Sequence, residues 1–107
     1  MAQHHAKSGE VVALPLGAAL ATAVTLTLVR TSEIEVLRLV IPAGKEIPSH
    51  TVPGPITVMC LAGSVAFTAH GVTHELKSGD FLYLETGEPH ALRGIQDSAV
   101  LVTIVLK

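Results

Sequence analysis

From residue 24 onward, the chain is a series of short β-rich runs, most of them followed by a turn that contains glycine or proline. The runs are rich in Val, Ile, Leu and Thr, and residues of this kind favour strands. Dipeptides such as Ala62-Gly63, His70-Gly71 and Thr86-Gly87 separate neighbouring runs. Many short strands with regular turn signals predict an all-β domain, either a sandwich or a closed barrel.

The expected strands follow directly from where these turns fall. Two of them form a hairpin near the start, joined by Arg30-Thr31-Ser32-Glu33, which would extend one sheet of the domain. The strands that the pattern predicts are 24–30, 33–41, 56–61, 64–69, 72–76, 81–85, 90–93 and 99–106.

Length and composition point to one domain. A chain of 107 residues with 49% hydrophobic residues has enough apolar material for a core of its own. The first ten residues are polar and include His4 and His5, which are more typical of a solvated terminus than of a metal site. We therefore expect residues 1–10 to form a flexible tail and residues 11–107 to form a single domain.

Residues 11–29 carry no charged side chain, and this is about the length that spans a bilayer. Pro15 and Gly17 interrupt the segment early, and residues 24–28 alternate with the period of a strand. We interpret it as an N-terminal arm leading into the first strand. No membrane partner is expected.

The charge pattern and the cysteine content indicate which partners and which cellular compartment to expect. The net charge is −2, and the basic residues are scattered along the chain, so no basic stripe is available for nucleic acid. The single cysteine, Cys60, cannot form an internal disulfide. This usage agrees with a reducing compartment, and we expect the protein to be cytoplasmic.

Several glycines and two histidines recur at defined spacings. Gly44, His50 and Gly63 fit the pattern G-x5-H-x-H-x3-E-x6-G. Gly79, Gly87 and His90 fit the pattern G-x5-P-x-G-x2-H-x3-N. Together these spacings resemble the two motifs of the cupin superfamily, and the chain is similar to a small, single-domain, RmlC-like cupin of type 2. The resemblance implies a double-stranded β-helix, also called a jelly-roll barrel, preceded by the N-terminal arm.

The metal-binding positions of these motifs are only half filled. The resemblance implies a divalent metal held by three histidines and a glutamate, but Val52 and Ile56 stand at two of those positions. Glu85 replaces a proline of the second motif, and Gly94 stands where the motif has its asparagine. His50 and His90 are thus the two remaining candidate ligands.

A third ligand would have to come from outside the motif. Cys60 is one candidate, because a thiolate with two imidazoles suits several transition metals. Glu85 is another, at the end of the strand that leads to His90. The cofactor expectation is therefore either no cofactor or a divalent metal, namely Fe, Zn, Mn, Cu or Ni.

Alternation along the strands predicts which side chains share the interior with the histidines. Val52, Ile56, Val58 and Cys60 have the phase of His50, while Leu92 has the phase of His90. Tyr83 is a further candidate whose face the alternation leaves open. The expected pocket is apolar with two imidazoles, and its residues are His50, Val52, Ile56, Val58, Cys60, Tyr83, His90 and Leu92.

Three functional classes fit such a pocket. The first is binding of a small, partly apolar molecule, with His50 and His90 as its polar contacts. The second is a metal-dependent enzyme of dioxygenase or other oxidoreductase type, and the third is a metal-free isomerase or epimerase with a histidine base. No catalytic residue can be assigned from the sequence. We also expect a homodimer, in which the apolar arm of residues 11–29 lies across a partner's sheet edge.

Overall fold

A computed structural model describes residues 5–14 and 25–106 of the chain. These residues contain strands and no helix. The strands are β1 (Leu26–Arg30), β2 (Ile34–Ile41), β3 (Glu46–His50), β4 (Ile56–Ala62), β5 (Ser64–Ala69), β6 (Val72–Lys77), β7 (Phe81–Leu84), β8 (His90–Gly94) and β9 (Ser98–Val105).

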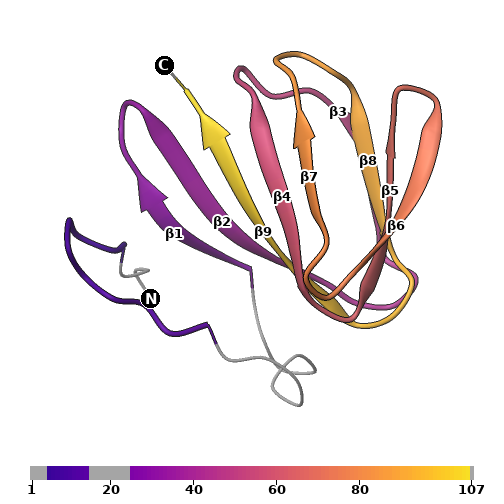
Figure 1. The fold of residues 1–107 in the computed structure, drawn as a ribbon, viewed down its shortest axis with the longest axis horizontal. Helices are drawn as coiled ribbons and strands as arrows, with labels where there is room; N and C mark the ends of the chain where they lie inside the picture. The colour runs from indigo at the N-terminus through magenta and orange to yellow at the C-terminus, as the bar shows by residue number, and fades with distance from the viewer. Residues whose placement is uncertain (1–4, 15–24, 107) are drawn as a thin grey trace.

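The strands form two antiparallel sheets. One has five strands in the order β1-β2-β9-β4-β7, and the other has four in the order β3-β8-β5-β6. The chain passes repeatedly from one sheet to the other, so strands distant in sequence become neighbours, as β2, β9 and β4 do in Figure 1. This is a double-stranded β-helix, which confirms the fold class expected from the sequence.

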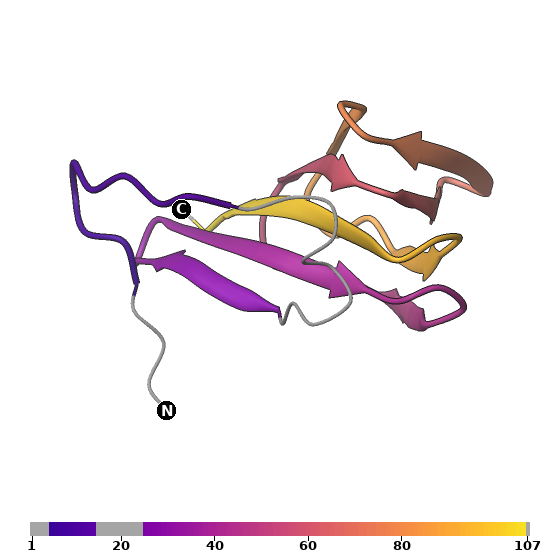
Figure 2. The ribbon, with the colours of Figure 1, turned by 90° about the horizontal axis from the view of Figure 1, so that it is seen from below.

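The hairpin expected near the start of the domain is present. β1 pairs with β2 in antiparallel register, and β2 pairs with β9 along its whole length. Figure 2 shows these three strands side by side at the edge of the larger sheet. The arm expected at residues 11–29 lies partly outside the described residues, although the backbone N–H of Ala6 donates a hydrogen bond to the carbonyl of Leu28 on β1.

The core lies between the two sheets and consists of alternate side chains from their facing sides. On β4, Ile56, Val58 and Cys60 are buried, whereas Met59 between them is exposed. Burial of each large aliphatic side chain contributes about 1.5–3 kcal/mol, and together these side chains hold the sheets face to face. The buried cluster comprises Ile41, Ile56, Val58, Cys60, Val65, Phe67, Ala69, Leu76, Leu84, Leu92, Val100, Val102 and Ile104.

β3 is the strand that the sequence pattern did not predict. It is an edge strand that pairs only with β8, and four of its five residues are exposed. Its sequence, Glu-Ile-Pro-Ser-His, lacks a run of β-branched residues and contains a proline, which an edge strand or a bulge accommodates. Tertiary pairing with β8 therefore overrides weak local preference here.

No helix in the described parts of the chain is long and apolar enough to cross a membrane.

Gly63, between β4 and β5, is required for two reasons. Its φ of +73° lies in the left-handed region, and a Cβ built on it would lie 2.1 Å from the carbonyl oxygen of Asp97. Gly71 in the β5–β6 turn has the same φ of +73°, but a Cβ there would meet nothing within 4 Å. A comparison of substitutions at these two positions therefore distinguishes the cost of backbone strain from the cost of steric overlap.

We predict that Gly63→Ala destabilises the protein more than Gly71→Ala does. Both substitutions carry a left-handed backbone cost of about 1–2 kcal/mol. Only Gly63→Ala also forces the neighbouring backbone aside, which adds about 1–3 kcal/mol. Urea unfolding of the two variants measures the difference, and equal losses of stability would contradict the steric argument.

Candidate functional site

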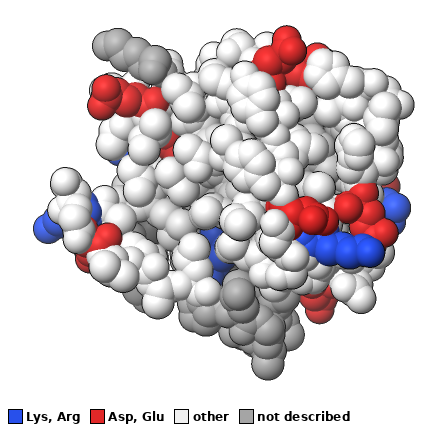
Figure 3. All heavy atoms as spheres, viewed as in Figure 1, with Lys and Arg blue, Asp and Glu red and all other residues white. Residues whose placement is uncertain are grey.

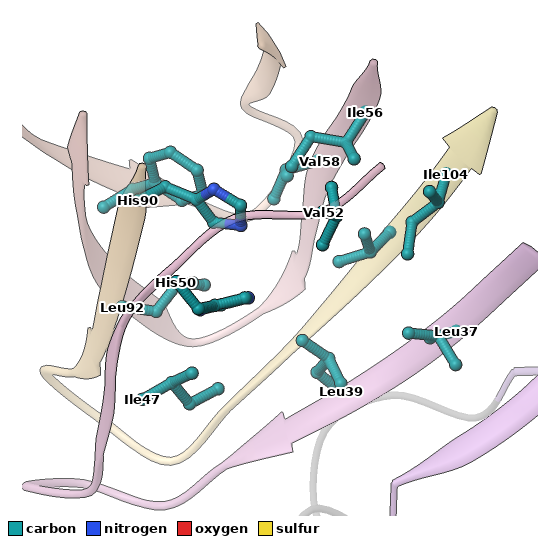
Figure 4. A pocket seen from close by; sticks show the side chains of 12 residues that line it. Leu37, Leu39, Ile47, His50, Val52, Ile56, Val58, His90, Leu92 and Ile104 are labelled. Carbon is teal, nitrogen blue, oxygen red and sulfur yellow. The ribbon is translucent and has the colours of Figure 1, made fainter. Parts of the chain in front are cut away.

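The inner faces of the two sheets enclose an apolar pocket of about 210 Å³. The smaller sheet contributes both imidazoles, and the larger sheet contributes mostly branched aliphatic side chains, as Figure 4 shows. The lining residues are Leu37, Leu39, Ile47, His50, Val52, Ile56, Val58, Phe67, His90, Leu92, Val102 and Ile104.

A β-bulge in β3 turns His50 into this pocket. Ile47 pairs with Leu92, and His50 pairs with His90. The two pairs are therefore three residues apart on β3 but only two residues apart on β8, which means that β3 contains one extra residue. In a regular strand, Ile47 and His50 would point to opposite faces. Because the bulge takes up one residue, Ile47 and His50 point to the same face instead, and both side chains line the pocket.

His90 lies deeper than His50. It is 4% exposed, and its ring stacks on Phe67 with 5.7 Å between the centroids and 5° between the planes. The His50 ring lies 4.4 Å from the His90 ring, centroid to centroid, at an angle of 55°. Because His50 is exposed and Val52 is half-buried, we infer that the pocket opens beside the segment that follows β3.

Both imidazoles are held by the same kind of backbone contact. Nδ1 of His50 donates to the carbonyl oxygen of Pro48 at 3.0 Å, and Nδ1 of His90 donates to that of Glu88 at 3.0 Å. A carbonyl only accepts, so the proton of each neutral ring lies on Nδ1 and the lone pair on Nε2. Within the described residues, neither Nε2 has a hydrogen-bond partner.

Most of the pocket residues expected from alternation do line the cavity. They are His50, Val52, Ile56, Val58, His90 and Leu92.

Tyr83 does not line the pocket, which corrects its inclusion among the pocket residues. Its side chain is 63% exposed, while its neighbours Leu82 and Leu84 turn inward. The β7 run is apolar on both faces, so its composition gave no indication of which side is buried. Pairing of Tyr83 with Thr57 of β4 places it on the outer face of the larger sheet.

Cys60 also lies outside the pocket lining, although it is fully buried. Its Sγ donates to the carbonyls of Ala62 and Gly63, at 3.5 and 3.6 Å, near the turn that ends β4. Burial raises the pKa of the Cys60 thiol. The side chain has the inward phase expected of it, but it lies too far along the strand to border the cavity.

Side chains suited to a third metal ligand do not gather around the two histidines. Nowhere in residues 5–14 and 25–106 do three His, Cys, Asp or Glu side chains lie together in a group that would hold a metal ion. Glu85 is exposed beyond the end of β7, and Glu88 contacts His70. A catalytic metal usually has three protein ligands, so the described residues do not fit such a site.

Six lining residues were missed by the sequence analysis. They are Leu37, Leu39, Ile47, Phe67, Val102 and Ile104. Strand alternation contains a signal for four of them, because Leu37 and Leu39 share a phase and so do Val102 and Ile104. Which of the two faces turns inward depends on how β2 and β9 are placed in the sheet.

Charged side chains lie apart from the pocket lining, which contains none. On the face seen in Figure 3, acidic and basic side chains occur in small scattered groups separated by uncharged surface. His70 and His74, at the β5–β6 turn and on β6, are both exposed.

Comparison with solved structures supports the fold. A conserved protein of unknown function from Streptococcus pyogenes aligns with a TM-score of 0.77 and 23% identity, over 100% of this chain and 96% of that one. A cupin superfamily protein from Desulfitobacterium hafniense aligns with a TM-score of 0.75 and 15% identity, over 78% and 77%.

An enzyme is also among the similar structures. The DMSP lyase of Ruegeria pomeroyi aligns with a TM-score of 0.65 and 27% identity, over 70% of this chain but only 39% of the lyase. No curated protein matches the sequence significantly.

The two sheets and the enclosed pocket define a double-stranded β-helix protein with an apolar interior. The sequence profile of the Cupin domain family matches residues 37–106, which is more than half of the chain. The chain therefore belongs to the cupin family.

We predict that the Cys60 thiol does not react with Ellman's reagent in the folded protein and reacts fully in guanidinium chloride. Because burial raises its pKa from the ordinary 9.0, the unfolded chain loses this proton first as the pH rises. The free energy of unfolding should therefore fall above about pH 9, and fall less in Cys60→Ala. Rapid reaction of the native thiol would contradict the burial described above.

We also predict that zinc added to the protein is held weakly and is lost on dialysis, because two imidazoles and water form a weak site. Metal analysis after dialysis checks this, with a His50→Ala/His90→Ala variant as the comparison. One zinc per chain that survives dialysis, and disappears in the double variant, would show that a third ligand exists.

Proposed function

We propose that this cupin binds a small, partly apolar molecule between its sheets, with His50 and His90 as the polar contacts. The observation that carries the proposal is the composition of the lining. Ten of its twelve residues are apolar, and the two others are imidazoles whose centroids lie 4.4 Å apart. A concave apolar site with a few convergent polar groups is the usual form of a small-molecule site.

Backbone anchoring of the histidines supports the same proposal. Each ring is fixed through Nδ1 to a carbonyl two residues earlier in the chain, and His90 is also stacked on Phe67. Polar groups held in this way lose little conformational freedom when a ligand binds, which favours affinity. The two Nε2 atoms are thus positioned before any ligand arrives.

The proposal predicts that filling the pocket abolishes binding. Val52→Phe places a larger side chain at the half-buried rim, while Val72→Phe makes the same change on β6, at a residue that does not line the pocket. Methyl NMR spectra of the wild-type protein, recorded with toluene or phenol, should show shifts for Leu37, Leu39 and Ile104. The shifts should vanish in Val52→Phe and persist in Val72→Phe.

The same spectra can overturn the proposal. If neither toluene nor phenol shifts the pocket methyl groups at millimolar concentration, the cavity is not a binding site for small molecules of this size. Shifts that persist unchanged in Val52→Phe would place the ligand elsewhere on the protein.

We further propose that the protein acts as a homodimer, joined through the outer face of the larger sheet. Phe81 and Tyr83 are 62% and 63% exposed there, and Met59, paired with Phe81, is 37% exposed. An aromatic side chain has about 150–250 Å² of surface, and a little over three fifths of it is exposed on each of these two. The two rings together therefore offer about 250 Å², roughly a third of the 800 Å² that each partner of a standard interface buries. The β4 residues paired with Phe81 and Tyr83 are Met59 and Thr57, which carry no charge, so this patch could meet a second copy of itself without repulsion between like charges at these positions.

Light scattering after size exclusion tests the dimer. The wild-type chain should have the mass of two chains, and Phe81→Ser/Tyr83→Ser the mass of one. Val72→Ser, which removes a 49%-exposed apolar side chain from the smaller sheet, is the matched control and should stay dimeric. A monomeric wild-type protein would defeat the proposal.

A further inference from the structure

The polar side-chain atoms of the pocket are of one kind. Of the lining residues only His50 and His90 carry polar side chains, and the Nδ1 atom of each already donates to a backbone carbonyl. In the neutral rings, the remaining Nε2 atoms are acceptors. The pocket side chains therefore offer two hydrogen-bond acceptors and no donor.

This inventory limits the charge of a ligand. A carboxylate or phosphate needs donors or cations, and the lining contains no Lys, Arg, Ser, Thr or Tyr. An ammonium group would need a carboxylate, and the lining has no Asp or Glu. An ion placed in an apolar cavity without such partners loses its hydration at a cost of several kcal/mol.

The volume limits the size. The cavity measures about 210 Å³. An apolar cavity of about 150 Å³ is large enough to bind benzene, so one ring with a few additional atoms fits here. Phe67 and the aliphatic residues would contact the ring, and a polar hydrogen on its substituent would face the imidazoles.

We infer that the ligand of this pocket is an uncharged, single-ring or similarly small molecule that donates a hydrogen bond, such as a phenol or an alcohol, to Nε2 of His50 or His90. This rests on the proposed function, since it specifies the ligand class of the same pocket. The hydroxyl of such a ligand satisfies one of these acceptors with a hydrogen bond. A ligand of the same shape without a donor leaves the acceptors unpaired.

Four compounds of similar shape test the inference at pH 8, above the ordinary titration range of histidine. They are phenol, which donates; anisole, whose oxygen only accepts; toluene, which does neither; and benzoate, which is an anion. Dissociation constants come from titrations followed by the methyl resonances of Leu37, Leu39 and Ile104. We expect phenol to bind at least as tightly as toluene, more tightly than anisole, and at least tenfold more tightly than benzoate.

Variants then connect the preference to the imidazoles. His50→Phe keeps a ring but removes one of the two acceptors. Either this variant or the corresponding change at His90 should weaken the binding of phenol at least fivefold relative to that of toluene. His50→Gln retains an oxygen that accepts a hydrogen bond, and should restore part of the preference. His74→Phe, at an exposed histidine that does not line the pocket, should change nothing. His90→Phe is the corresponding change at the buried ring, and His90→Gln, which like His50→Gln retains an acceptor, is its matched control.

The outcomes separate the inference from the function on which it rests. If toluene binds in the pocket but phenol is tenfold weaker in the wild-type protein, the pocket is a purely apolar site and the inference is wrong while the proposed function stands. Benzoate binding more tightly than phenol would also overturn the inference. If none of the four compounds binds, both the inference and the proposed function fail.

Discussion

The bulge in β3 is the constraint on which the candidate site depends. In a regular strand, the three-residue separation of Ile47 and His50 would turn one of these side chains towards solvent, because successive residues of a strand alternate between faces. The bulge takes up one residue and leaves both side chains on the inner face. The bulge also places the Pro48 carbonyl where Nδ1 of His50 donates to it. One backbone irregularity therefore brings the imidazole into the pocket and fixes which of its nitrogen atoms is free.

His90 on β8 has the same contact between Nδ1 and a backbone carbonyl, but without a bulge. His90 lies at the start of a regular strand, and its Nδ1 donates to the carbonyl of Glu88 just before it. The result is two rings from two adjacent strands, tilted by 55° to each other, one exposed at the rim and one packed on Phe67. Metal-ligating histidines in proteins usually have their second ring nitrogen anchored in the same way, but here Val52 and Ile56 occupy the two other ligand positions of the motif. An apolar wall replaces the remaining ligands, so the pocket suits an uncharged molecule better than an ion.

Much of the fold could be predicted from the sequence because the strong signals were local. Most strands coincide with a β-rich run ended by a turn, and the glycine spacing around His50 and His90 indicated the family correctly. β3 was missed because its stability comes from pairing with β8, which no local pattern contains. Tyr83 was misplaced for a related reason, since both faces of β7 are apolar and only the packing of the sheets shows which one is covered. Cys60 points inward, as the alternation predicted. Whether an inward side chain reaches the cavity also depends on its position along the barrel, and alternation contains no information about that position.

By itself, the sequence determined the class of fold, the positions of most strands and the loss of two metal-ligand positions, because these depend on residue type, spacing and turn chemistry. The tertiary structure alone decided that Ile47 and His50 share a face, that both Nε2 atoms are free, and that no third ligand group gathers among the described residues. The physical reason is that these properties depend on register and on contacts between strands far apart in the chain. A bulge that shifts register by one residue reverses which side chains are buried, and only the paired strand fixes where that shift occurs.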